Sequence, residues 1–287
     1  MLKIEARAKI NLTLDILRKR PDGYHEVVMV MQSVGLSDTL TLEKAPAAAG
    51  IVLTCNLPDL PVNEKNLAYR AARLFLDQYQ MEAGVSIALE KRIPMAAGLA
   101  GGSADAAAVL RGMALLFSTD TSEEELCRMG AKLGSDIPFC ICGGTMLAEG
   151  RGEKLSKVAD LPECWVVLAK PPADVSTAWV YQQYDAQAAE EHPDTTKMLQ
   201  VLEKGDLYTA SQLLCNVLES VTIKRYPEIQ MYKDRMDANG ALASLMSGSG
   251  STVFCLTEEE ETARKIAEDL RSHTAAKVFV TKTVSRN

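Results

Sequence analysis

The residues best placed to bind a charged ligand are the small ones between positions 94 and 108, whose sequence is PMAAGLAGGSADAAA. Alternating residues at 85–90 predict a strand before this run, and an alanine-rich helical pattern follows it to Phe117. The first N–H groups of a helix lack intrahelical partners and lie at the positive end of its dipole, so such a loop can surround phosphate. Glycines at a tight strand-to-helix connection can also serve backbone geometry alone.

The loop lacks the common nucleotide signatures, since no lysine precedes Ser103, G-x-G-x-x-G does not fit, and H-R-D and D-F-G are absent. It resembles the phosphate loop of the GHMP kinase superfamily, with Pro94, Gly98, Leu99 and Ser103 in matching places. The resemblance implies that Ser103 binds Mg²⁺ and that ATP is the cofactor. The loop residues implied to bind ATP are Pro94, Met95, Ala96, Ala97, Gly98, Leu99, Ala100, Gly101, Gly102, Ser103 and Ala104.

Composition excludes several other classes of function. The chain has 287 residues, 47% of them hydrophobic, which is typical of a globular protein with one large domain or two smaller ones. A net charge of -7 argues against a nucleic-acid partner. Seven scattered cysteines and three dispersed histidines favour reduced thiols and no transition metal. We expect a cytoplasmic protein without a membrane partner, since no apolar signal core or membrane-spanning run is visible.

Two segments near the N-terminus resemble one particular family within the GHMP kinase superfamily. Lys9 and Asn11 alternate with apolar residues of a predicted strand at 2–17, where a lysine is usually just solvated. Pro-Asp-Gly at 21–23 is turn chemistry, followed by Tyr24 and His25. Both segments resemble the GHMP family that phosphorylates 4-diphosphocytidyl-2-C-methyl-D-erythritol in the non-mevalonate isoprenoid pathway. The resemblance implies this small-molecule substrate, with Tyr24 stacking on cytosine, His25 hydrogen-bonding it, and Asn11 in the same site.

A third segment carries the implied catalytic group. Asp136 follows a helix-ending glycine and could be a turn or capping residue, but 134–139 matches the family motif around its catalytic aspartate. The resemblance implies that Asp136 is the general base, that it contacts substrate, and that Lys9 keeps it ionised. Asn66 is predicted to cap a helix, and by resemblance Asn66 and Lys91 lie beside the nucleotide. Ser247 to Thr252 resembles the family block beside the phosphate loop.

The coarse element pattern predicts an α+β protein. Strands are expected at 27–36, 38–43, 50–55, 143–148, 165–169, 242–246, 253–256 and 277–284, and helices from Asn66, from Thr121 to Gly134, and at 176–184, 196–203, 206–219 and 258–271. The second half favours helices packed on an antiparallel sheet. By resemblance, residues 1–155 form a lobe like ribosomal-protein S5 domain 2, and residues 156–287 form a ferredoxin-like lobe. We expect a monomer or a weak homodimer.

Two other functions stay open from the sequence. One is a GHMP kinase with a different small alcohol as acceptor, for which Tyr24 and His25 would have no base to bind. The other is a GHMP-like fold that binds a nucleotide or a partner without catalysis. The presence of Lys9, Ser103 and Asp136 disfavours the second, because each fills a separate catalytic role.

Overall fold

The computed structural model describes residues 1–186, 189 and 191–286. By internal contacts the chain divides into a first unit, made of Met1–Ala8, Leu36–Met95 and Ala100–Cys142, and a second unit made of Lys9–Gly35, Ala96–Leu99 and the chain from Gly143 onward. Strands β1 (Leu2–Lys19) and β2 (His25–Ala45) contribute residues to both units. The units are therefore interleaved along the sequence, and the expected boundary after residue 155 stays a prediction.

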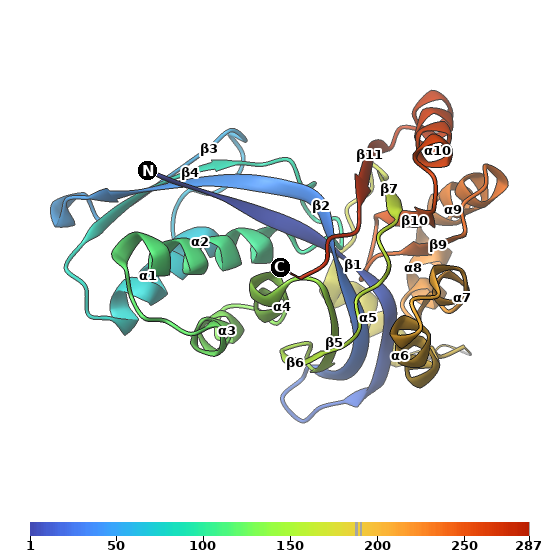
Figure 1. Cartoon of the computed structure of the whole chain (residues 1–287), viewed down its shortest axis with the longest axis horizontal. Coiled ribbons are helices and arrows are strands. Elements are labelled where there is room, and N and C mark those ends of the chain that lie inside the picture. The colour runs from blue at the N-terminus through green and yellow to red at the C-terminus, as the bar shows by residue number, and fades with distance from the viewer. Residues whose placement is uncertain (187–188, 190, 287) are drawn as a thin grey trace. The chain divides into compact units, whose positions relative to one another are not determined.

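The first unit is built on a four-strand segment, in the order β3-β4-β2-β1, that is covered by helices. The end of β2 pairs antiparallel with β4 (Gly84–Glu90), and β4 pairs parallel with β3 (Ile51–Cys55). Helices α1 (Leu67–Gln78) and α2 (Gly101–Phe117) pack together on one side of these strands (Figure 1). A Cβ at Gly112 would lie 2.8 Å from Leu42 Cδ2, so this glycine allows α2 to approach β2 closely. The remaining elements are η1 (Ala47–Ala49), α3 (Glu123–Ala131) and α4 (Ile137–Cys142).

The second unit contains an antiparallel sheet with helices packed on it, as the sequence predicts. Its strand order is β11-β7-β10-β9, and α9 and α10 pack on it (Figure 1). Elsewhere β5 pairs with β2 and β6, and β8 pairs parallel with β1. The elements are β5 (Thr145–Gly150), β6 (Lys154–Lys157), β7 (Trp165–Lys170), α5 (Thr177–Ala186), α6 (Thr195–Glu203), α7 (Leu207–Gln212), β8 (Cys215–Asn216), α8 (Glu219–Arg225), α9 (Glu228–Ala238), β9 (Ala243–Met246), β10 (Val253–Thr257), α10 (Glu260–His273) and β11 (Lys277–Lys282).

Two element predictions are wrong for physical reasons. The predicted gap at residue 37 does not exist, because Ser37 and Asp38 are both buried within a continuous β2, where Asp38 accepts hydrogen bonds. The predicted helix over 206–219 is divided into α7, β8 and α8. Asn216 interrupts it, since its amide donates to the carbonyls of Met246 and Gly248 while the chain pairs with β1. In the described part of the chain, no helix is both long and apolar enough to span a bilayer.

Candidate active site

The phosphate loop joins β4 to α2 through residues with left-handed backbone. Ala96, Gly98 and Ala100 have φ values of 48°, 73° and 56°. Ala100 is the N-cap of α2 and makes no side-chain cap hydrogen bond, so no side chain of the cap occupies the first N–H groups of the helix. The strand, loop and helix follow one another in the order predicted from the sequence. Uncapped N–H groups at the positive end of a helix dipole suit an anion.

The tip of the loop, residues 96–99, is anchored inside the second unit. Ser247 Oγ donates to the Gly98 carbonyl at 3.0 Å, and the Thr252 N–H donates to the Ala97 carbonyl at 3.4 Å. A Cβ on Gly98 would lie only 2.1 Å from the Ser247 carbonyl oxygen, so the close approach requires glycine. The predicted neighbourhood of the 247–252 segment and the loop is confirmed.

Lys9 and Asn11 lie beside this loop tip. The Lys9 N–H donates to the Leu99 carbonyl at 3.2 Å, and its ammonium donates to Asn11 Oδ1 at 2.6 Å. Both side chains are buried, and the Lys9 ammonium lies 3.4 Å from the Cβ position of Gly248. The structure therefore brings together Lys9, Asn11, the loop tip and the 247–252 segment, which are far apart in sequence.

Ser103 and Asp136 belong to the first unit. Ser103 is half-buried in the first turn of α2, and its Oγ lies 4.0 Å from the Cβ position of Gly134. Asp136 is half-buried immediately before α4, and its carbonyl accepts the Cys140 N–H at 3.1 Å. The segment that carries Asp136 thus passes close to the start of α2, which bears Ser103.

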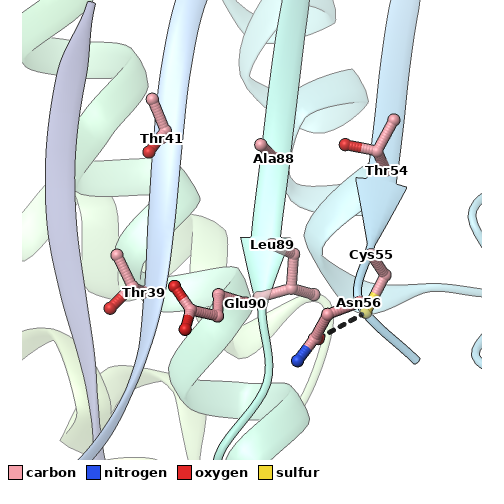
Figure 2. Close-up of a pocket in the computed structure, with 8 residues that line it drawn as sticks. All are labelled: Thr39, Thr41, Thr54, Cys55, Asn56, Ala88, Leu89 and Glu90. Atoms are coloured by element: carbon pink, nitrogen blue, oxygen red, sulfur yellow. Dashed lines mark hydrogen bonds between the residues drawn. The ribbon is translucent and has the colours of Figure 1, made fainter.

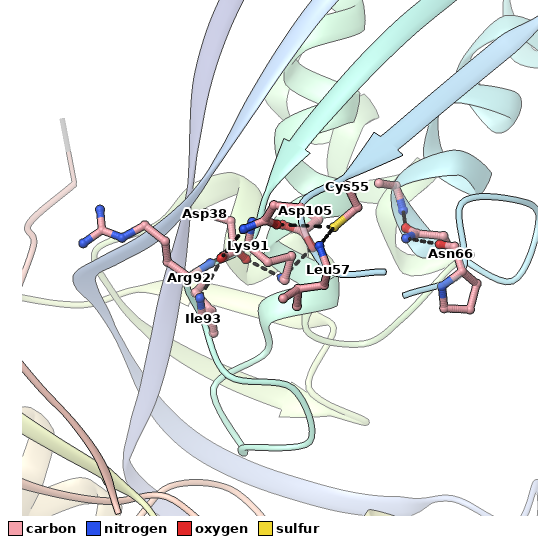
Figure 3. A network of polar contacts seen from close by, with 11 residues as sticks. Asp38, Cys55, Leu57, Asn66, Lys91, Arg92, Ile93 and Asp105 are labelled. Atoms are coloured by element: carbon pink, nitrogen blue, oxygen red, sulfur yellow. Dashed lines mark hydrogen bonds and ion pairs between the residues drawn. The ribbon is translucent and has the colours of Figure 1, made fainter. Parts of the chain in front are cut away.

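A buried charge cluster supports the chain just before the loop (Figure 3). The Lys91 ammonium contacts Asp38 Oδ2 and donates to Asp105 Oδ2 at 2.7 Å. Asp38 Oδ1 also accepts the N–H groups of Arg92 and Ile93. Lys91 therefore links β2 to α2, and Asp38 fixes the backbone that enters the phosphate loop.

Burial controls the titration of this cluster. Desolvation, opposed by Lys91, raises the pKa of Asp105 to about 7. Asp105 Oδ1 is buried and, within the described residues, accepts no hydrogen bond. The two carboxylates outweigh desolvation at Lys91 and raise its pKa, so the ammonium is charged at neutral pH.

Asn66 caps α1 as predicted. Its Oδ1 accepts the Ala68 N–H at 2.9 Å, and its Nδ2 donates to the Pro61 carbonyl at 2.7 Å. Both functions of the amide are therefore used within the protein. The implied contacts of Asn66 and Lys91 with a nucleotide stay predictions.

Tyr24 and His25 have opposite environments at the start of β2. Tyr24 is 55% exposed, and the Arg151 guanidinium lies 5.0 Å from the centre of its ring. The His25 imidazole is buried, and its Nε2 lies 2.7 Å from Asp185 Oδ1. An exposed aromatic ring can provide a stacking face for a base, and an imidazole held by a carboxylate can provide a hydrogen-bonding edge.

Comparisons with known proteins identify the family of this chain. The profile described as GHMP kinases N terminal domain matches residues 66–144, and GHMP kinases C terminal matches residues 198–276. A 4-diphosphocytidyl-2-C-methyl-D-erythritol kinase of Acetivibrio thermocellus is 47% identical over 283 residues, which are 99% of each chain. The chain belongs to the 4-diphosphocytidyl-2-C-methyl-D-erythritol kinase family. It is a small-molecule kinase with the mixed α+β fold of the GHMP kinases.

Further relatives support the same family. A 4-diphosphocytidyl-2-C-methyl-D-erythritol kinase of Bacillus pumilus is 50% identical over 93% of this chain and 92% of its own. A crystal structure of 4-(cytidine 5'-diphospho)-2C-methyl-D-erythritol kinase superposes with a TM-score of 0.83 at 34% identity, covering 98% of this chain and 99% of that one. The L. major mevalonate kinase in complex with R-mevalonate shares the fold, with a TM-score of 0.76 at 18% identity over 100% and 97% of the two chains.

Sequence reasoning missed a hollow of about 240 Å³ on the strands of the first unit. Figure 2 shows threonines of β2 and β3 on either side of β4, with Thr39 near the Glu90 carboxylate. None of the site residues predicted from the sequence lines this hollow. At its edge Asn56 binds both backbone groups of Lys91, so the hollow adjoins the charge cluster and not the phosphate loop itself.

Sequence reasoning also missed Asp38, Asp105 and Asp185. Their partners are 53, 14 and 160 positions away along the chain. A local signal existed only for Asp105, an acidic residue within a run of small apolar ones.

Proposed function

We propose that this member of the family transfers the γ-phosphoryl group of ATP to the 2-hydroxyl of 4-diphosphocytidyl-2-C-methyl-D-erythritol, giving the 2-phosphate and ADP. One observation carries the proposal: the chain matches kinases of that substrate's name over nearly the full length of both chains. The reaction belongs to the non-mevalonate route to isoprenoid precursors.

The phosphate loop suits the ATP phosphates by its donor chemistry. Residues 96–102 carry no bulky polar side chain, and the N-cap of α2 leaves the first-turn N–H groups without a side-chain partner. A Cβ at Gly102 would have only Leu67 near it, at 3.6 Å, so the surface there is open. The Ser103 hydroxyl is an oxygen ligand of the kind that Mg²⁺ prefers. Mg²⁺, when bound, neutralises phosphate charge during transfer.

Asp136 and Lys9 take the proton and charge functions in this proposal. The Asp136 carboxylate accepts the proton of the substrate 2-hydroxyl while that oxygen forms its bond to the γ-phosphorus, and the bond from the γ-phosphorus to the bridging oxygen of ADP breaks. Lys9 assists by stabilising the negative charge that develops during transfer. Phosphoryl transfer depends mainly on positioning and charge stabilisation, so a carboxylate and an ammonium are the types of group that it requires.

Asn11, Tyr24 and His25 hold the substrate in the proposal. Tyr24 offers an exposed ring to cytosine, His25 hydrogen-bonds the base, and Asn11 contacts the substrate. The experiment that tests the function is ADP release from Mg-ATP with the cytidyl substrate, mevalonate, homoserine or galactose as acceptor. We expect turnover with the cytidyl substrate alone. Turnover with another acceptor would keep Asp136 but remove the cytosine site, and ATP binding without turnover would support a binding protein.

The variant Asp136→Asn tests the base assignment. We expect kcat to fall by about 100-fold or more, with little change in ATP affinity, because the amide cannot accept the proton. Asp77→Asn is the matched control, since this exposed carboxylate lies on α1 in a weak pair with Arg73. Near-normal turnover in Asp136→Asn would remove Asp136 from the mechanism.

A further inference from the structure

His25 belongs to a three-residue cluster in the second unit that no motif indicates. The Nε2 of His25 lies 2.7 Å from Asp185 Oδ1, and the Lys19 ammonium pairs with Asp185 Oδ2. The side chains come from the start of β2, from α5 and from the end of β1. One carboxylate oxygen of Asp185 thus contacts a lysine, and the other contacts the imidazole.

The cluster determines which ring nitrogen of His25 carries a proton. The hydrogen bond from Lys19, followed by that from His25, lowers the pKa of Asp185, so its carboxylate is ionised at neutral pH and can only accept. Nε2 must therefore carry the hydrogen, and a neutral imidazole keeps its lone pair on Nδ1. The Tyr181 ring, 4.9 Å from the imidazole and tilted by 41°, packs against it and limits its rotation.

The other two histidines show the opposite arrangement. His192 contacts Asp15 Oδ1 at 2.7 Å through Nδ1, and His273 contacts the Asp269 carbonyl at 2.8 Å through Nδ1. Both acceptors require the hydrogen on Nδ1 of these rings when they are neutral. His25 therefore differs from both of them in its tautomer.

We propose that Asp185 is a positioning residue that makes His25 Nδ1 a hydrogen-bond acceptor and thereby selects cytosine over uracil. The proposal rests on the proposed function, in which His25 reads the base. Cytosine carries an N–H donor at position 4, which complements an acceptor, whereas uracil carries an oxygen there, and two acceptors would face each other. A site built for a hydrogen bond discriminates against a base that leaves its group unpaired.

The kinetic test compares the cytidyl substrate with its uridyl analogue. We expect native protein to prefer the cytidyl compound in kcat/KM by about 10-fold or more. In Asp185→Asn the amide can donate to or accept from Nε2, so the tautomer is no longer fixed. The preference should then fall several-fold, mainly through a higher KM for the cytidyl substrate. Asp185→Glu keeps a carboxylate and should retain part of the cytidyl preference. The control Asp174→Asn, at an exposed carboxylate paired with Lys170, should retain all of that preference.

The spectroscopic test needs no substrate. With three histidines in the chain, ¹⁵N-histidine labelling gives three assignable rings, and His192→Gln and His273→Gln complete the assignment. We expect the Nε2–H form at His25 and a mixture of tautomers there in Asp185→Asn. The Nδ1–H form at His25 in native protein, or an unchanged base preference in Asp185→Asn, would overturn the proposal. Absence of any turnover of the cytidyl substrate would instead overturn the proposed function, while the tautomer is still read by NMR.

Discussion

Two lysine and carboxylate clusters in this kinase use the same chemistry at different depths. In the first unit the side chains of Lys91, Asp38 and Asp105 are 4%, 0% and 4% exposed. In the second unit Lys19 is 59% exposed and Asp185 is 25% exposed. Charges that leave water lose their hydration and depend on each other, whereas exposed charges keep water as an alternative partner. The difference indicates that loss of one partner destabilises the protein more in the buried cluster than in the open one, which mainly orients the His25 ring.

The largest effect is expected from breaking the buried cluster. Lys91→Met leaves Asp38 and Asp105 without their counter-charge inside the protein, and it should lower the free energy of unfolding by about 3–5 kcal/mol. Urea unfolding of native and variant protein measures this loss. A loss below about 1 kcal/mol would mean that water reaches the cluster and that burial does not determine how much the loss of Lys91 destabilises the protein.

The second prediction concerns pH and the same cluster. The pKa of Asp105 is about 7 in the folded protein and 3.8 in the ordinary carboxyl, so the folded state binds its proton more tightly than the unfolded state. Stability is then lost as pH rises from about 4 to about 7, because the carboxyl of the unfolded chain ionises over this range while burial keeps the proton on folded Asp105. Asp105→Asn removes this ionisation and keeps an acceptor for Lys91.

The measurement is urea unfolding of native protein and Asp105→Asn at pH 5 and pH 8. At pH 5 the two proteins should have similar free energies of unfolding. At pH 8 the free energy of unfolding of the variant should exceed that of native protein by a few kcal/mol. A gap that is the same at both values, or that shrinks at pH 8, would contradict a raised pKa at Asp105. Asp77→Asn serves again as the control, with no gap expected at either pH.

The phosphate loop was accessible to prediction because its signals are local. Strand alternation, small residues and the Asn66 cap lie next to the elements they define, and β4, α2 and α1 appear where the pattern places them. The same local reasoning failed at residue 37, where it separated two strands, whereas β2 is continuous there and the adjacent Asp38 accepts hydrogen bonds from a distant segment.

The charge clusters could not be predicted from the sequence, since the residues that pair in them come from distant segments. Nothing near Asp185 indicates a histidine 160 positions earlier, and nothing near Asp38 indicates Lys91. Burial decides whether such a residue is a solvated side chain or part of a network, and burial is a property of the complete fold. The candidate site was thus predictable as residue types and order, whereas its supporting charges were not.

The smallest effect is expected from Lys19→Met, the counterpart of Lys91→Met in the open cluster. The Lys19 ammonium is more than half exposed, so its loss should change the free energy of unfolding by about 1 kcal/mol or less. The pKa of Asp185 should rise toward its ordinary value, but the carboxylate stays ionised at pH 7 and the 2.7 Å hydrogen bond from His25 persists. Urea unfolding and the cytidyl-to-uridyl preference should therefore both stay near native values. A loss as large as that of Lys91→Met would show that depth of burial is not what separates the clusters. A collapse of the base preference alone would move the control of the His25 tautomer from Asp185 to Lys19.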